Sequence, residues 1–310
     1  GLAAALVTTG SVFFNPARDA LLPALAEGAV LTRANAGIAV SQHAAQLMGP
    51  LMAAAVLASR PLAESFLWDA GTFLLSFLLL LLIRLPPGTA RSAATRVDVA
   101  GALAYVRARP ELKALLLLTA LNNLFIMGPA MVGSAFMIRE VAATGGAFVL
   151  PWGTALGSEA MFALYLAVFS AGMIVGSLAV GRWGGRFPGW ALLTAGIALD
   201  GLTFLPFEPL AARGDYPALL AALFFHAACV PLIGVVRPAL VQAHVPAARL
   251  GQVFGLVNLA VFGCTALSAA GAGWVLGLGV TPGRLFTIAA VGGGLSGAFA
   301  LMLPALRRLR

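Results

Sequence analysis

Polar side chains inside long apolar runs are the residues of this sequence whose types could support chemistry. Asn122 and Asn123 stand side by side in one run, Asp200 lies in another, and His226 shares a helical face with Arg237, eleven residues further on. An unpaired polar group is costly in lipid, so each of these either pairs with a neighbouring helix or lines a path for a solute. An imidazole titrates near neutral pH. We therefore treat His226 and Asp200 as candidates for proton coupling, with interhelical hydrogen bonding as the alternative.

A second polar stripe lies in the apolar run over residues 36–58. Asn35, Gln42 and Gln46 follow at i, i+7 and i+11, which places them on one face of a helix together with Gly49. Amide side chains inside a bundle serve as interhelical hydrogen-bond partners or mark a moving interface. Both interpretations apply to this stripe.

Residue patterns for enzyme catalysis are missing from the sequence. His43, His226 and His244 lie too far apart for a His-Glu-x-x-His zinc site, and no Asp-rich motif for Mg²⁺ is present. Lys113 is the only lysine, and no Gly-x-x-x-x-Gly-Lys-Ser/Thr motif exists, so ATP hydrolysis by this chain is excluded. We predict a protein that is not an enzyme and that needs no cofactor or metal ion.

The composition indicates which elements must position these polar groups. The chain has 310 residues, of which 61% are hydrophobic and only 10% are charged, whereas soluble domains have about 25% charged residues. This excludes a soluble globular protein and predicts an all-α, multi-pass membrane protein, because the apolar runs are continuous rather than alternating. Nine apolar segments are long enough, or nearly long enough, to cross a membrane: 1–14, 36–58, 65–83, 114–138, 160–180, 190–207, 217–236, 253–278 and 285–306.

The basic residues predict how the segments are oriented. Fifteen of the 19 Lys and Arg residues lie in the loops after the first, third, fifth and seventh segments or in the tail, and only Arg60, Arg139, Arg213 and Arg284 lie on the other side. Positive loops stay in the cytoplasm, so we expect a cytoplasmic carboxyl terminus in a bacterial inner membrane. The charge of +8 follows from this bias, and we expect no nucleic-acid partner.

One long polar stretch divides the segments into two groups. Residues 84–113 contain an apolar stripe formed by Val99, Ala102, Leu103 and Val106, which predicts a helix lying in the cytoplasmic interface. We expect three domains: residues 1–83 as part of an N-terminal bundle, 84–113 as a linker, and 114–310 as a six-helix bundle.

A short repeated motif resembles a known family. Asn15-Pro16-Ala17, Leu22-Pro23 and Arg33 follow the first segment, and Arg237-Pro238-Ala239, Val245-Pro246 and Arg249 follow the seventh. The first copy resembles the helix 4–5 signature of the major facilitator superfamily, in the branch of the enterobactin exporter and the transmembrane secretion effectors. The resemblance implies a twelve-helix fold of two six-helix bundles, of which helices 4 to 12 are present, with an odd number of helices upstream.

The resemblance also implies where the polar residues lie. In that family, helices 1, 4, 7 and 10 line a central cavity, which here implies Thr8, Thr9, Asn122, Asn123 and His226. Gln42, Gln46 and Asn258 would lie between the two halves, and Asp200 would lie on a peripheral helix. A monomer is expected.

Two further motifs resemble gating elements of the family. Gly181-Arg182-Trp183-Gly184-Gly185-Arg186 is similar to its cytoplasmic loop motif, with Gly181 in place of the acidic residue, and Gly49-Pro50 resembles the antiporter motif of helix 5. A positive loop and a packing kink are the simpler interpretations. We assign the interface and gate to Asn35, Gln42, Gln46, Gly49, Pro50, Gly181, Arg182, Gly184, Arg186, Arg237 and Asn258.

Together these patterns predict a secondary active transporter that exports a small, partly apolar molecule by alternating access, coupled to protons. An importer of the same fold and a non-transporting receptor or scaffold are the alternatives.

Overall fold

The computed structural model describes residues 14, 17–26, 29–59, 62–82, 98–151 and 153–309, and these residues are almost entirely helical. Thr8 and Thr9, the first predicted segment and much of the linker lie outside the described residues. The one sheet in the described part is a small antiparallel pair of strands, β1 (Phe148–Val149) with β2 (Ala155–Leu156). The prediction of an all-α membrane protein is confirmed.

Six of the described helical stretches are long and apolar enough to cross a membrane: Pro110–Gly145, Ser158–Arg186, Gly189–Ala212, Tyr216–His244, Ala247–Gly277 and Pro282–Leu301. They correspond in order to the last six predicted segments. Two long helices near the N-terminus precede them, α2 (Ala29–Ser59) and α3 (Leu62–Leu81).

Prolines divide three of these stretches without ending them. The first consists of α5 (Pro110–Gly128), a π-helical turn η2 (Pro129–Gly133) and α6 (Ser134–Gly145). Pro129 has no N–H to donate to the backbone hydrogen bonds of a regular α-helix. The Ser268 hydroxyl accepts a hydrogen bond from the Gly128 N–H at 2.7 Å. The third stretch contains α8 (Gly189–Leu202) and α9 (Phe207–Ala212), on either side of Pro206.

The fourth stretch corrects the prediction at Arg237. It contains α10 (Tyr216–Cys229), α11 (Pro231–Gly234) and α12 (Val236–His244), so Arg237-Pro238-Ala239 is helical and not a connector. Pro238 lies in the first turn of α12, where a missing N–H costs little. Val230 and Val235, which join these three helices, keep right-handed helical backbone angles, so the stretch continues through Pro231.

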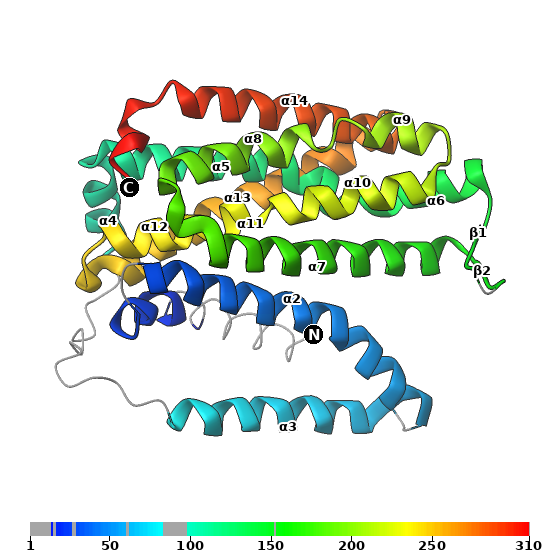
Figure 1. Ribbon diagram of the computed structural model, residues 1–310, viewed down its shortest axis with the longest axis horizontal. Helices are drawn as coiled ribbons and strands as arrows, with labels where there is room; N and C mark the ends of the chain where they lie inside the picture. The colour runs from blue at the N-terminus through cyan, green and yellow to red at the C-terminus, as the bar shows by residue number, and fades with distance from the viewer. Residues whose placement is uncertain are drawn as a thin grey trace.

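The six long stretches from Pro110 to Leu301, which we call the C-terminal unit, pack against one another at small residues. α14 (Pro282–Leu301) lies along α8, α13 (Ala247–Gly277) lies along α5, and α10 lies along α7 (Ser158–Trp183) (Figure 1). Gly201 and Gly293 meet so closely that a Cβ built on Gly201 would lie 2.6 Å from the Gly293 Cα. Small residues allow this approach, which is how helices associate in lipid.

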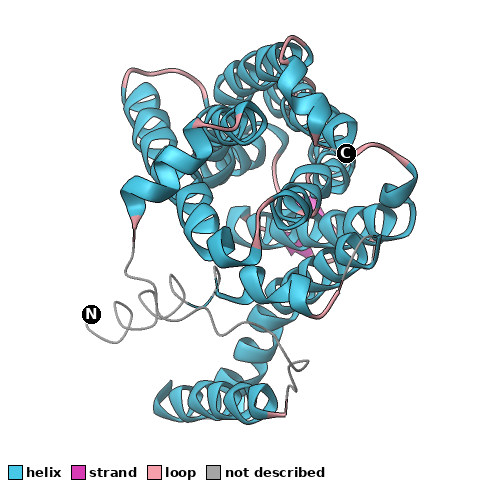
Figure 2. Ribbon diagram, turned by 90° about the vertical axis from the view of Figure 1, so that its left-hand side faces the viewer, coloured by secondary structure: helices cyan, strands magenta, loops and turns pink. Residues whose placement is uncertain are grey.

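The two N-terminal helices sit outside this unit. α2 packs along α7, whereas α3 contacts chiefly α2 and lies apart from the bundle (Figures 1 and 2). The side chains of α3 are exposed along much of its length, including Leu67, Phe73 and Leu81. In a membrane such an apolar surface faces lipid or another helix.

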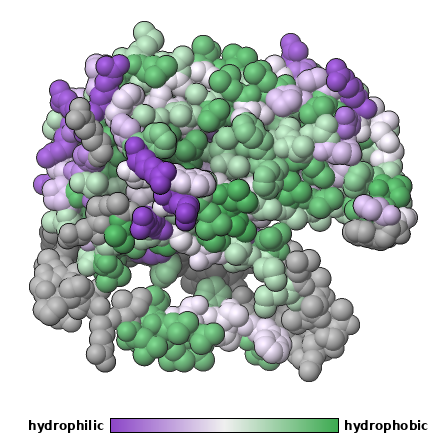
Figure 3. Space-filling view, viewed as in Figure 1, coloured by the Kyte–Doolittle hydropathy of each residue, from purple (hydrophilic) through white to green (hydrophobic). Residues whose placement is uncertain are grey.

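The two ends of the bundle differ in charge, as the loops predict. α4 (Val99–Arg107) forms within the predicted linker, with the Asp98 carboxylate accepting from the Gly101 N–H as its N-cap. Its Val106 joins a buried cluster with Val180 and Leu309, so Arg107, Arg182 and the C-terminal turn lie at one end. Hydrophilic residues gather at the two ends of the molecule, and apolar residues lie between them (Figure 3).

Candidate functional site

A buried polar cluster connects three helices of the C-terminal unit. Asn122 on α5 donates from Nδ2 to Oδ2 of Asp200 on α8 at 2.9 Å. The Oδ1 of the same carboxylate lies 3.8 Å from Nε2 of His226 on α10. Asp200 and His226 are each 3% exposed. Two residues predicted to line the cavity and the candidate acid are thus brought together.

The hydrogen bond between His226 and Thr203 determines which ring nitrogen of His226 carries the hydrogen. Thr203 donates its only hydroxyl hydrogen to the Leu199 carbonyl at 2.5 Å, so the same hydroxyl can only accept from Nδ1 of His226, 2.7 Å away. A neutral imidazole therefore turns the lone pair of Nε2 toward the Asp200 carboxylate. Two acceptors facing each other in a buried site leave a place for one proton.

Aromatic rings hold the imidazole in this position. The Phe204 ring stacks on His226 with ring centroids 4.0 Å apart, and Phe207 approaches it edge-on at 6.1 Å. Phe286 in turn contacts both phenylalanines. Because protein surrounds the ring, His226 does not border an open cavity in this conformation.

Asp200 and Asn123 lie in other surroundings than expected. The resemblance implies a peripheral helix for Asp200, yet its side chain is buried, because α8 packs along α14 and also contacts α11, α10 and α5. Asn123 is also buried, yet it donates to the Thr119 carbonyl of its own helix, and its Oδ1 lies 3.5 Å from the Thr265 hydroxyl on α13. The adjacent amides therefore make contacts between different helices: Asn122 connects α5 with α8, and Asn123 connects α5 with α13.

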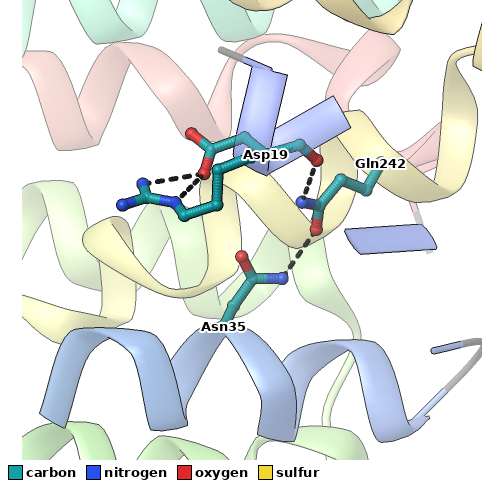
Figure 4. Close-up of polar contacts among 4 residues, drawn as sticks. Asp19, Asn35 and Gln242 are labelled. Atoms are coloured by element: carbon teal, nitrogen blue, oxygen red, sulfur yellow. Dashed lines mark hydrogen bonds and ion pairs between the residues drawn. The ribbon is translucent and has the colours of Figure 1, made fainter. Parts of the chain in front are cut away.

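A second polar group joins the N-terminal helices to the C-terminal unit. Asn35 on α2 donates from Nδ2 to Oε1 of Gln242 on α12 at 2.6 Å, and Gln242 Nε2 donates to the Asp19 carbonyl at 2.7 Å (Figure 4). Asp19 also pairs with Arg18, with 2.8 Å between the charged atoms. Gln242 thereby bridges two segments of the N-terminal part.

A cavity of about 180 Å³ adjoins this bridge. Arg237 lines it, together with Asn35 and Gln42 from α2 and Asn258 from α13. The charge of Arg237 interacts with both Asp19 and Asp200. Four residues predicted for the interface between halves therefore border one space, and Arg237 links that space to the buried cluster.

The remaining residues of the predicted stripe are exposed to different surroundings. Gln42 and Gln46 are exposed, and Gln46 Oε1 lies 3.1 Å from Nδ1 of His43 on the same helix. Gly49 is exposed, with no atom near a Cβ built on it. Pro50 lies inside α2 and does not end the helix. Asn35 is the one of the three amides whose hydrogen bond to the C-terminal unit the structure shows, whereas Gln42 borders the cavity beside Arg237.

The predicted glycine turn lies against the start of α2. After α7 ends at Trp183, η3 (Gly184–Arg186) makes a short 3-10 turn before α8. A Cβ on Gly181 would lie 2.8 Å from Ala36, and Gly184 is buried near Thr32. The glycines thus allow a close approach of α7 to α2, while Arg182 and Arg186 remain exposed.

Sequence reasoning missed Gln242, Thr203 and Asp19. Gln242 lies among residues expected to form a loop, where a polar side chain is ordinary and does not indicate a functional site. Thr203 could have been noticed, because it lies three residues after Asp200 in an apolar run. Among the described residues, no group of three His, Cys, Asp or Glu side chains could hold a metal ion.

Comparison with known proteins gives a structural match only. No protein-family profile matches the chain, and no curated protein matches it significantly. The chain is similar to the fucose:proton symporter FucP of E. coli, with a TM-score of 0.62 and 14% sequence identity, over 93% of this chain and 72% of that one. This likeness shows that the chain shares the fold of that symporter.

Proposed function

We propose that this protein is a secondary active transporter that moves a small organic molecule by alternating access and couples this movement to protons. The observation that carries the proposal is the facing pair of acceptors, Asp200 Oδ1 and His226 Nε2, 3.8 Å apart and buried. Ionisable groups inside membrane helices are expensive and commonly belong to ion or proton pathways. The structural similarity to a transporter also supports the proposal of a secondary active transporter.

Asn122 is suited to accompany a change in protonation of Asp200. When the carboxylate is charged, the amide donates to it; the Oδ1 of Asn122 is buried and has no hydrogen-bond partner among the described residues. A protonated carboxyl group could donate to that oxygen after the amide rotates, because an amide offers both a donor and an acceptor. Asn122 could therefore satisfy both states of the acid.

Arg237 provides a route from the proton site to the helix interface. Its charge interacts with both Asp200 and Asp19, and Asp19 belongs to the bridge through Gln242 to Asn35. Neutralising Asp200 removes one of two attractions on Arg237 and leaves the one toward Asp19. A proton on Asp200 would thus bias the contact between α12 and the N-terminal part, which is the kind of differential contact that coupling requires.

We propose export of a partly apolar molecule from the cytoplasm of a bacterial cell, by a monomer with its carboxyl terminus inside. The Gly49-Pro50 pair and the small number of charges on the C-terminal helices support this direction. Import by symport is the second candidate, favoured by the similarity to a fucose:proton symporter. A non-transporting receptor remains the alternative outside the class.

The test uses the full-length protein in liposomes that contain the pH indicator pyranine, with ethidium and L-fucose as separate probes. We expect movement of a probe to shift the internal pH, in opposite senses for antiport and symport. Asp200→Asn should retain exchange of the probe between equal pools but lose the pH change, whereas Glu159→Gln, an acid at the start of α7, should retain both. Coupling that survives in Asp200→Asn would overturn the assignment of the proton site. A receptor would give no probe movement in either protein.

A further inference from the structure

Three arginines surround a pocket at the contact between α2 and α7. Arg33 of α2 and Arg182 and Arg186 of the α7–η3 segment line it, together with Gly181 and Gly185. Its volume is about 230 Å³. This is the end of the bundle that the positive loops predict to be cytoplasmic, and a hydrophilic patch is visible where α7 and α2 adjoin (Figure 3).

The three positive charges lack acidic partners in the part of the chain that the structure describes. The ion pairs found there join Arg18, Arg284 and Arg308 to acids, and none involves the pocket arginines. Gly181 and Gly185, the other two lining residues, have no side chains that would fill the pocket. Three unpaired guanidinium groups around one space favour an anion, and planar guanidinium groups match phosphate oxygens.

The neighbouring side chains indicate that this anion belongs to a lipid. Trp183 and Phe187 flank the arginines in the sequence and are 47% and 57% exposed. The guanidinium group of Arg182 lies 6.0 Å from the centre of the Trp183 ring. Exposed aromatic rings beside basic residues are typical of the headgroup level of a membrane, and basic pockets between helices there bind anionic headgroups.

We infer that this pocket binds the phosphate group of an anionic phospholipid and holds it at the junction of α2 with α7. The arginines would contact the phosphate oxygens, and Trp183 and Phe187 would lie against the upper part of the acyl chains. A bound headgroup would stabilise the α2–α7 contact by neutralising like charges on the two helices. The inference does not depend on the direction or the existence of transport.

The test measures lipid binding to the delipidated full-length protein by native mass spectrometry. Dioleoylphosphatidylglycerol and dioleoylphosphatidylcholine are titrated separately, with inorganic phosphate as a competitor. The variant Arg33→Gln/Arg182→Gln/Arg186→Gln is compared with Arg107→Gln/Arg307→Gln/Arg308→Gln, which removes three charges from the same end outside the pocket.

We expect the pocket variant to bind the anionic lipid about 10- to 100-fold more weakly, because each of the three arginines should contribute a similar share of the binding free energy. The affinity of the control variant should change by less than about threefold. Equal losses in both variants would overturn the inference, because they indicate a diffuse charge effect. Full displacement of the lipid by inorganic phosphate would also overturn it, in favour of a soluble phosphate ligand. If the triple variant fails to fold, Arg186→Gln, at an exposed position, and the charge-conserving Arg186→Lys replace it, and only the first should lose the anionic lipid.

Discussion

Asp200 and His226 come from different helices, α8 and α10, and face each other with Oδ1 and Nε2 3.8 Å apart. This distance is longer than a hydrogen bond, so a shared proton would need the two helices to approach slightly or a side chain to turn. The Thr203 hydroxyl and the Phe204 ring hold the imidazole from its other sides. We propose that small helix movements change the protonation of the pair, and that protonation in turn favours one helix arrangement.

Replacing His226 by Gln should flatten the pH dependence of transport. Glutamine keeps a donor for Thr203 but cannot bind a proton near neutral pH, so we expect the rate to vary less than about twofold over a range in which the parent protein varies about tenfold. The measurement is probe flux in liposomes at a series of pH values. His244→Gln is the matched control, because His244 hydrogen-bonds to the Leu240 carbonyl of its own helix and not to the Asp200 cluster. A parallel change in both variants would argue against a special role for His226.

Asn122→Ala and Asn123→Ala separate the roles of two adjacent amides. Removing Asn122 takes away the donor to a buried carboxylate, which we expect to destabilise the protein by about 1–3 kcal/mol and to alter its pH dependence. Asn123→Ala should reduce stability without changing the pH profile, because its amide serves Thr119. The thermal midpoint in detergent and the flux at several pH values distinguish the two effects. Identical pH profiles in both variants would contradict the assignment.

The bridge between Asn35 and Gln242 should appear as a coupling energy. In a double-mutant cycle with Asn35→Leu and Gln242→Leu, we expect an interaction of about 0.6–1.7 kcal/mol, the range for hydrogen bonds between membrane helices. The cycle with Gln46→Leu in place of Asn35→Leu should give a value near zero, since Gln46 is exposed. The measurement is unfolding in mixed micelles. Additive effects for the first pair would show that the contact does not hold the two parts together.

Gly201→Ala should lower the thermal midpoint. The added Cβ would lie 2.6 Å from the Gly293 Cα, and overpacking of this kind costs about 1–3 kcal/mol, or roughly 2–6 °C. Gly255→Ala is the control, because a Cβ there meets no atom and alanine favours the helix. The control should melt at or slightly above the parent value. An unchanged midpoint in Gly201→Ala would mean that α8 and α14 are not in close contact.

The positive loops predict the sidedness of the bundle. Arg307→Cys and Arg213→Cys place thiols at exposed positions on the two predicted sides. In right-side-out vesicles, a membrane-impermeant maleimide should label Arg213→Cys and spare Arg307→Cys, and inverted vesicles should give the opposite pattern. The parent protein, with Cys229 and Cys264, supplies the background. Labelling of Arg307→Cys from the outside would reverse the topology.

The sequence by itself was sufficient for the membrane class, the order of the last six segments and the helix around Val106. These features follow from local properties: the length of an apolar run, the spacing of a stripe and the distribution of arginines along the chain. The first segment and most of the linker lie outside the described residues, and the cytoplasmic placement of the basic end stays a prediction. Arg237 was placed in a loop because a proline beside an arginine suggests an end, whereas a proline in a first helical turn is compatible with continuation.

Only the tertiary structure decided which polar groups meet. The sequence identified Asn122, Asp200 and His226 as unusual, but helical spacing cannot relate residues on three different helices, and Asp200 was assigned to the periphery. Their meeting depends on how α8 packs along α14 and approaches α10 and α5, and close glycine contacts such as that of Gly201 with Gly293 permit this packing. The same holds for Gln242, whose partners Asn35 and Asp19 are more than 200 positions away in the chain. Spacing along a helix determines which face a side chain occupies, but the packing of helices determines what that face touches.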